Sequence, residues 1–148
     1  MTEDEVLFRE KLNPAWWMWL LFLGLAGSVL IALVPIATWL GILGAVIVLI
    51  LAPVIAYARA SSIVVTEDSL RVGRASIERR FVGEVEAFTD AEDVRRVRGP
   101  ELDARSYMNF SASASGMCRI EITDPVDPTP YWLTATRRPH ELAEALVS

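Results

Sequence analysis

The chain has 148 residues, of which 53% are hydrophobic, and it carries a formal net charge of −5 at pH 7. This acidity disfavours nucleic-acid binding, because that function needs a concentrated basic surface. The single cysteine, Cys118, excludes an internal disulfide.

Residues 1–13 form a short segment of mixed charge that precedes Pro14. The apolar residues in it, Val6, Leu7 and Phe8, allow two interpretations: a segment that lies along a membrane surface, or a loosely ordered terminus. The sequence predicts a cytoplasmic N-terminal segment, distinct from the parts that follow.

An uncharged block at 12–58 predicts a transmembrane hairpin at 14–58, with two helices at about 16–34 and 38–57. At about 1.5 Å per residue, the first helix spans roughly 28 Å, close to the ~30 Å hydrocarbon core of a bilayer. A buried hairpin of a soluble protein is the alternative, but soluble domains of this size rarely contain so long an apolar block. A cleaved signal peptide is disfavoured because acidic residues open the chain where basic residues are expected.

Basic residues flank the uncharged block on both sides, and the connection at 35–37 has none. They are Arg9 and Lys11 before the block and Arg59, Arg71 and Arg74 after it. The positive-inside rule therefore predicts a cell-membrane protein with two spans and both termini in the cytoplasm.

Two sets of residues are expected to position the helices. Tryptophans at the predicted interfaces are expected to anchor them in the headgroup region: Trp16, Trp17, Trp19 and Trp39. Small residues are expected to let the helices pack closely: Gly24, Gly27, Ser28, Gly41, Gly44 and Ala45.

Residues 59–148 hold twelve of the fourteen basic and fifteen of the nineteen acidic residues, and we expect them to form a cytoplasmic domain. Strands are predicted at 62–66, 69–73, 76–80, 82–88, 104–110, 117–123 and 131–136. A helix capped by Asp90 is predicted at 91–98, and a closing helix begins at Pro139. The predicted fold class is therefore a membrane α-helical hairpin plus a small α+β domain, with antiparallel strands and a C-terminal helix.

No residues form a recognisable catalytic, cofactor-binding or metal-binding motif, so we expect neither an enzyme nor a cofactor. Asp124 and Asp127 lack the ligand series of a calcium loop and are typical of Asp-Pro turns. Cys118 lies in a predicted strand and suits a small core residue. His140 has no second metal ligand, so we expect it to face solvent at the start of a helix. The serine-rich stretch at 111–116 is interpreted as a loop.

Paired arginines and an aromatic pair are the residues that we expect to contact a lipid or a partner: Arg79, Arg80, Arg137, Arg138, Tyr131 and Trp132. The leading hypothesis is a non-enzymatic scaffold or accessory subunit, whose partner is another membrane protein or a second copy of the chain. The alternative is a module that binds membrane lipid through anionic headgroups at the inner leaflet, where each basic residue contributes about 1 kcal/mol. Because acidic residues are interleaved with the arginines, a solvated surface is a third interpretation.

Four motifs follow the apolar block: LRVGR at 70–74, RFVGEV at 80–85, DPVDPTPYWL at 124–133 and TRRP at 136–139. With the two Trp-rich helices, they resemble an uncharacterised actinobacterial membrane-protein family, a domain of unknown function. The order of the elements is similar to the bacterial pleckstrin-homology-like (PH-like) domains found behind paired membrane helices. The resemblance implies a location and an architecture, and it implies no chemistry.

Overall fold

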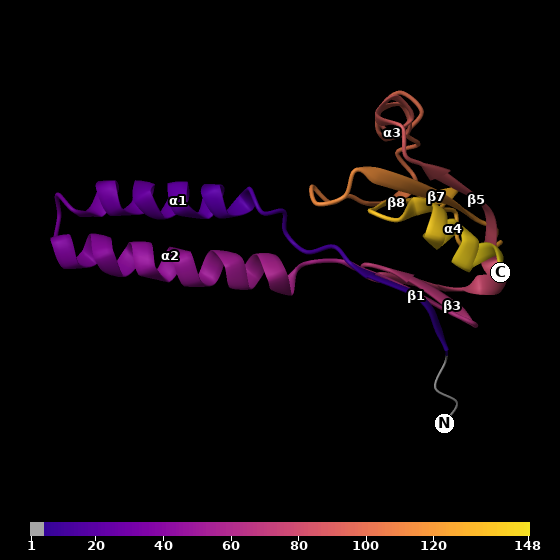
Figure 1. Cartoon of the computed structure of the whole chain (residues 1–148), viewed down its shortest axis with the longest axis horizontal. Helices are drawn as coiled ribbons and strands as arrows, with labels where there is room; N and C mark the ends of the chain where they lie inside the picture. The colour runs from indigo at the N-terminus through magenta and orange to yellow at the C-terminus, as the bar shows by residue number, and fades with distance from the viewer. Residues whose placement is uncertain (1–4) are drawn as a thin grey trace. The chain divides into compact units, whose positions relative to one another are not determined.

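The computed structural model describes residues 5–148, which divide into two compact units. One unit, at 13–60, is a helical hairpin. The other, the α+β unit, combines the N-terminal residues up to Leu12 with residues 61–148. Figure 1 shows the elements of each unit.

The helical hairpin consists of α1 (Met18–Leu33) and α2 (Thr38–Ala58), joined by a short connection (Figure 1). By length and composition, the 21 residues of α2 are sufficient to cross a membrane. The 16 residues of α1 are fewer than the ~20 that a spanning helix usually needs. This helix is shorter than the predicted 16–34 because the residues at both of its ends form turns.

The two helices approach each other closely at the glycines of α2. A Cβ atom added at Gly41 would lie 2.8 Å from the Cγ2 atom of Val34, and one added at Gly44 would lie 2.9 Å from a side-chain carbon of α1. By contrast, a Cβ atom added at Gly24 or Gly27 would have no neighbour within 4 Å. These two glycines of α1 therefore do not make the close approach that the sequence predicted.

The buried face of α1 explains this correction. Phe22 and Ala26, four residues apart, are its buried residues. Gly24 lies between them in sequence and so points away from that face, because a helix turns through about 100° per residue. The Ser28 hydroxyl donates to the Gly24 carbonyl oxygen at 2.8 Å, so it bonds within its own helix.

The α+β unit contains two four-stranded sheets (Figure 1). The first sheet has the order β1 (Val6–Lys11), β2 (Ser62–Thr66), β3 (Ser69–Val72) and β4 (Ala75–Glu78), all antiparallel. The second sheet has the order β5 (Val82–Phe88), β7 (Gly116–Ile122), β8 (Tyr131–Thr136) and β6 (Tyr107–Asn109). β6 runs parallel to β8, so the second sheet is mixed and not wholly antiparallel as predicted.

The strand β1 replaces the separate N-terminal segment that the sequence predicted. It pairs antiparallel with β2, which lies on the other side of the helical hairpin in sequence. Phe8, Glu10 and Leu12 are buried and the residues between them are exposed, which is the period of a half-buried strand. The hairpin is therefore inserted between two adjacent strands of one sheet.

The hydrophobic core of the α+β unit is formed by residues from both sheets and both of its helices, α3 (Ala91–Arg98) and α4 (Pro139–Val147). Fully buried members include Ile63 and Leu70 from the first sheet and Leu133 from the second. α4 packs against β5, β7 and β1, and α3 packs against β7. α3 has the bounds and the cap that the sequence predicted, since Asp90 accepts the Glu92 backbone N–H at 2.8 Å.

We expect Gly41→Ala to destabilise the helical hairpin by about 1–3 kcal/mol, because the added methyl group would meet Val34 and the Leu30 carbonyl oxygen. Gly24→Ala is the matched control. Its methyl group meets nothing, so the helix propensity of alanine should leave stability unchanged or raise it by up to about 1 kcal/mol. Thermal unfolding of the detergent-solubilised chain, followed by circular dichroism, measures both. Equal midpoints would contradict a close approach at Gly41.

Candidate functional site

A buried carboxylate joins β1 to the end of β8. Glu10 is 4% exposed, and it accepts hydrogen bonds from the Thr136 hydroxyl, from the Arg137 backbone N–H at 2.9 Å and from Arg137 Nε at 3.3 Å. A buried carboxylate needs such donors in place of water. Glu10 was not identified from the sequence. Its only signal in the sequence was its position midway between Phe8 and Leu12, which have the spacing of residues on one face of a strand.

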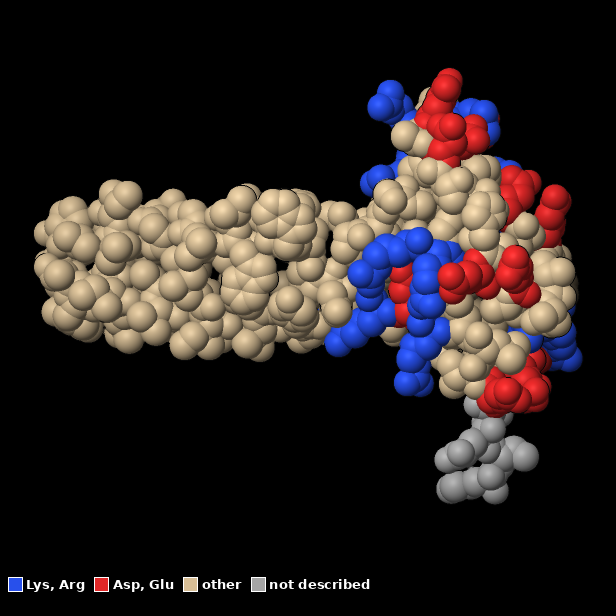
Figure 2. Space-filling model, in the orientation of Figure 1, with Lys and Arg blue, Asp and Glu red and all other residues tan. Residues whose placement is uncertain are grey.

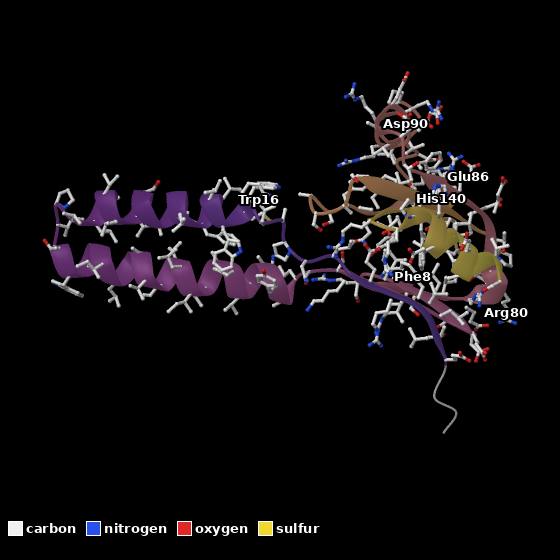
Figure 3. All side chains as sticks on the ribbon, in the orientation of Figure 1. Phe8, Trp16, Arg80, Glu86, Asp90 and His140 are labelled. Carbon is white, nitrogen blue, oxygen red and sulfur yellow. The ribbon has the colours of Figure 1, made fainter. Side chains whose placement is uncertain are left out.

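Arg137 and Arg138 lie along the open edge of β1. Arg137 donates to the Lys11 carbonyl oxygen and Arg138 donates to the Arg9 carbonyl oxygen, both at 2.7 Å. The Arg138 guanidinium also lies 4.7 Å from the ring centroid of Phe8, which Figure 3 labels. Backbone groups on an edge strand lack strand partners, and these arginines satisfy two of them. Both arginines therefore hold β1 in place.

Arg79 caps the C-terminal end of α4 with its guanidinium group. Its guanidinium donates to the carbonyl oxygens of Ala145, Leu146 and Ser148 at 2.9–3.0 Å. The last turn of a helix leaves such acceptors without intrahelical donors, and the helix dipole favours a cation there. The short 3-10 turn Arg79–Phe81 follows β4. Through the hydrogen bonds of Arg79, this turn is joined to α4.

Arg80, which Figure 3 labels, follows Arg79 in sequence but has different contacts. It pairs with Glu78 at 2.6 Å, and its guanidinium lies 4.6 Å from the ring centroid of Phe81. The two paired side chains are 69% and 61% exposed, so the ion pair contributes little to stability. Arg80 remains on the surface, with an acidic neighbour that offsets its charge.

Tyr131 and Trp132 are consecutive residues of β8 and point to opposite faces. Trp132 is 4% exposed, and its ring centroid lies 5.5 Å from that of Tyr107. It stabilises the core and does not supply the contact surface that the sequence predicted. Tyr131 is half-buried, and its hydroxyl accepts the Asp103 backbone N–H at 2.8 Å. Of this pair, Tyr131 alone presents part of its ring to the surface.

The first sheet has an unpaired basic surface, formed by Arg9, Lys11, Arg71 and Arg74. Within residues 5–148, none of these side chains forms an ion pair. Acidic residues occupy the opposite end of the same sheet: Glu67, Asp68 and Glu78. Figure 2 shows Lys and Arg side chains at several places on the unit, including a group on the visible face, with Asp and Glu side chains beside them.

The tryptophans of the helical hairpin are exposed, with fractions between 41% and 78%. Trp16, which Figure 3 labels, and Trp17 lie in the turn before α1, and Trp19 lies in its first turn. Trp39 lies in the first turn of α2, at the other end of the hairpin. This places aromatic side chains at both ends of the apolar surface.

A shallow hollow of about 230 Å³ on the second sheet has an acidic lining that includes Glu84, Glu86 and Glu121. Glu86, labelled in Figure 3, pairs with Arg119 at 2.5 Å, and Glu121 accepts the Glu84 backbone N–H at 3.0 Å. Among residues 5–148, no group of three or more His, Cys, Asp or Glu side chains is placed to hold a metal ion. The carboxylates of Glu86 and Glu121 are therefore engaged with neighbouring protein groups.

The remaining residues that the sequence analysis considered are Asp124, Asp127, Cys118 and His140. Asp124 and Asp127 each accept a backbone N–H two residues further on, at 2.9 Å, and hydrogen bonds from Thr129 lower the pKa of Asp127. Cys118 is fully buried in β7, and burial raises the pKa of its thiol to about 12. His140 is exposed on α4, as predicted (Figure 3).

We expect Glu10→Ala to destabilise the α+β unit by about 1–3 kcal/mol, because the Thr136 hydroxyl and the Arg137 amide lose their acceptor. Cys118 supplies the readout, since its buried thiol should react with a thiol reagent at pH 8 only after the unit opens. Labelling should therefore accelerate about 5- to 150-fold. The control is Glu144→Ala, an exposed acid on α4. Equal rates for the two variants would mean that Glu10 does not secure β1.

Arg79 and Arg80 are adjacent in sequence, so replacing each in turn gives a second matched comparison of stability. Arg79→Met removes charged hydrogen bonds to the end of α4 and should cost about 1.5–3 kcal/mol. Arg80→Met removes an exposed ion pair and should change stability by less than about 0.5 kcal/mol. Denaturant titration of the full chain, followed through Cys118 labelling, separates the two. If Arg80→Met were as damaging as Arg79→Met, the contact with α4 would not be the cause.

A family model described as "Protein of unknown function (DUF3093)" matches residues 7–146. Comparison with curated proteins and with solved structures gave no significant match to either. The match begins within β1 and ends within α4, so it includes the helical hairpin and nearly all of the α+β unit. The chain therefore belongs to this family of proteins of unknown function (DUF3093).

Proposed function

We propose that this protein is an integral protein of the cell membrane, with two spans and with both termini and the α+β unit in the cytoplasm. The length of α2 supports insertion, and so does the absence of charge from Leu12 to Ala58. Exposed apolar side chains surround both helices, and Figure 2 shows no Lys, Arg, Asp or Glu on the visible surface of α1 and α2. Apolar turn residues, including Trp16 and Ile36, extend the short α1 at its two ends.

We also propose that the α+β unit is related to PH-like domains and that the family is actinobacterial. The antiparallel strands followed by a closing helix support the first relation. The motif at 124–133 and the Trp-rich helices support the second. Both proposals concern ancestry and leave the chemistry of the unit open.

The function that the geometry supports best is that of a non-enzymatic scaffold or accessory subunit of a membrane complex. The observation that carries this proposal is the insertion of the hairpin between β1 and β2, two strands that pair with each other. Both ends of the hairpin are therefore covalently connected to the α+β unit, one to β1 and the other to β2. The charged groups Glu10, Arg79 and Arg137 hold the unit together, which is consistent with a structural role.

The partner in this proposal is another membrane protein or a second copy of the chain. The outer face of α1 supports such a contact, because Gly24 and Gly27 leave space beside the helix. A second candidate function, contact with anionic lipid headgroups, is favoured by the basic surface of the first sheet.

We expect the chain, captured from native membranes through a tag at Ser148, to retain a membrane protein or a second copy in fixed stoichiometry. Gly24→Leu should release it by filling the outer face of α1, whereas Gly24→Ala should retain it. Native mass spectrometry after gentle solubilisation measures the composition. A lone chain in every detergent tested would contradict the scaffold proposal. Activity of a cytoplasmic reporter fused at Ser148 tests the topology separately.

A further inference from the structure

We propose that the basic surface of the first sheet, defined above by Arg9, Lys11, Arg71 and Arg74, docks onto the anionic phospholipid headgroups of the cytoplasmic leaflet. This inference rests on the proposed membrane insertion and names the ligand of the α+β unit. It also moves the expected lipid contact away from Arg79, Arg137 and Arg138, whose guanidinium groups are engaged with backbone carbonyl oxygens.

Strand register brings two of these side chains together on the outer face of the sheet. Arg9 of β1 lies opposite Val64 of β2, and Val64 lies opposite Arg71 of β3. Both arginines are exposed. Strands in a sheet are about 4.8 Å apart, so the two residues are roughly 10 Å apart across the half-buried valine.

The other two residues lie at one end of the sheet. Lys11 is opposite Ser62, whose carbonyl oxygen accepts the Gly73 backbone N–H at 2.8 Å, and Arg74 follows Gly73 in the turn between β3 and β4. Gly73 has φ 58°, a conformation that favours glycine, and a Cβ atom there would lie 3.0 Å from the Tyr107 hydroxyl. The turn that carries Arg74 is therefore closely packed against Tyr107 of β6.

Among residues 5–148, no ion pair offsets the charges of this surface. Most other arginines of the unit have an ion pair or an engaged guanidinium, whereas these four side chains have no ion-pair partner among residues 5–148. Like charges about 10 Å apart, such as Arg9 and Arg71 on either side of β2, repel each other when the ionic strength is low. Phosphate groups would relieve this repulsion, and arginine can bind them through two parallel hydrogen bonds.

Two covalent links join the first sheet to the helical hairpin. β1 ends at Lys11, and β2 begins at Ser62, four residues after α2 ends at Ala58. Both links thus leave from the end of the sheet that carries Lys11 and Arg74. Glu67 and Asp68 lie in the turn at the opposite end. The basic end of the sheet is therefore the end nearer in sequence to both helices.

The charge pattern favours a lipid surface over a soluble anion. Each basic residue at an anionic leaflet raises membrane partitioning about fivefold, and the gain falls as salt screens the charges. Four such residues, on the outer face and at one end of the sheet, add their contributions when the ligand is an extended surface. No cavity is required for that contact, and the exposed side chains on the outer face of the sheet suit it.

The test uses the full chain reconstituted into vesicles of phosphatidylcholine, with or without phosphatidylglycerol. Ser76, exposed and opposite Arg71, is replaced by cysteine as a reporter for a membrane-impermeant thiol reagent. Asp68→Cys reports on the opposite end of the sheet, and the buried Cys118 gives a slow background. With phosphatidylglycerol present, labelling at position 76 should slow about tenfold at low salt and recover at high salt, while position 68 is unchanged.

Charge reversal distinguishes this surface from general electrostatics. Arg71→Glu with Arg74→Glu should abolish the protection of position 76. Arg95→Glu with Arg98→Glu, an equal change of charge on α3, should preserve it. Equal labelling of position 76 in neutral and anionic vesicles, or equal effects of the two double variants, would overturn the proposal.

Two further experiments show which proposal a negative result contradicts. Carbonate extraction shows whether the chain is inserted: a chain released from the vesicles contradicts the membrane proposal itself, whereas an inserted chain with an unprotected position 76 contradicts the docking alone. An oligonucleotide added to neutral vesicles should leave labelling unchanged. If it protected position 76 as well as phosphatidylglycerol does, the surface would bind polyanions in general, and the assignment to lipid would be wrong.

Discussion

The antiparallel pairing of β1 with β2 joins two segments that the whole helical hairpin separates in sequence. This pairing carries Glu10 into the unit, where the Thr136 hydroxyl and the Arg137 amide replace the water that the carboxylate loses. A shift of one residue would expose Phe8 and Glu10 and bury Arg9. The register is therefore strongly determined, and with it the attachment of both ends of the hairpin to adjacent strands.

The arginines of the α+β unit differ in function according to the acceptors near them. Arg79 and Arg138 reach the end of a helix and the edge of a strand, where backbone carbonyl oxygens lack other donors. Arg71 lies on the outer face of a strand, whose backbone groups already bond to the neighbouring strands. Its guanidinium is therefore left for solvent or for an external anion. The arginines that stabilise the fold and the exposed Arg71 therefore occupy separate positions.

Short-range patterns predicted most elements of the α+β unit. β8 has the predicted bounds, 131–136, and α3 follows its predicted cap, because alternation and capping depend on residues a few positions apart. β1 was missed because its few apolar residues stabilise a strand only when β2 is beside it. The parallel direction of β6 was also missed, since the choice of β8 as its neighbour depends on packing across the second sheet.

Local sequence is sufficient for the uncharged apolar block, the long helix α2 and the α+β character, because composition and periodicity are properties of neighbouring residues. Long-range packing decided which candidate residues are exposed or engaged. It directed Gly41 toward α1 and Gly24 away from α2, and it buried Trp132 in the core. It also brought Arg9 and Arg71 onto one face. The contacts of each of these residues depend on how distant elements cross or pair, and no local pattern contains that information.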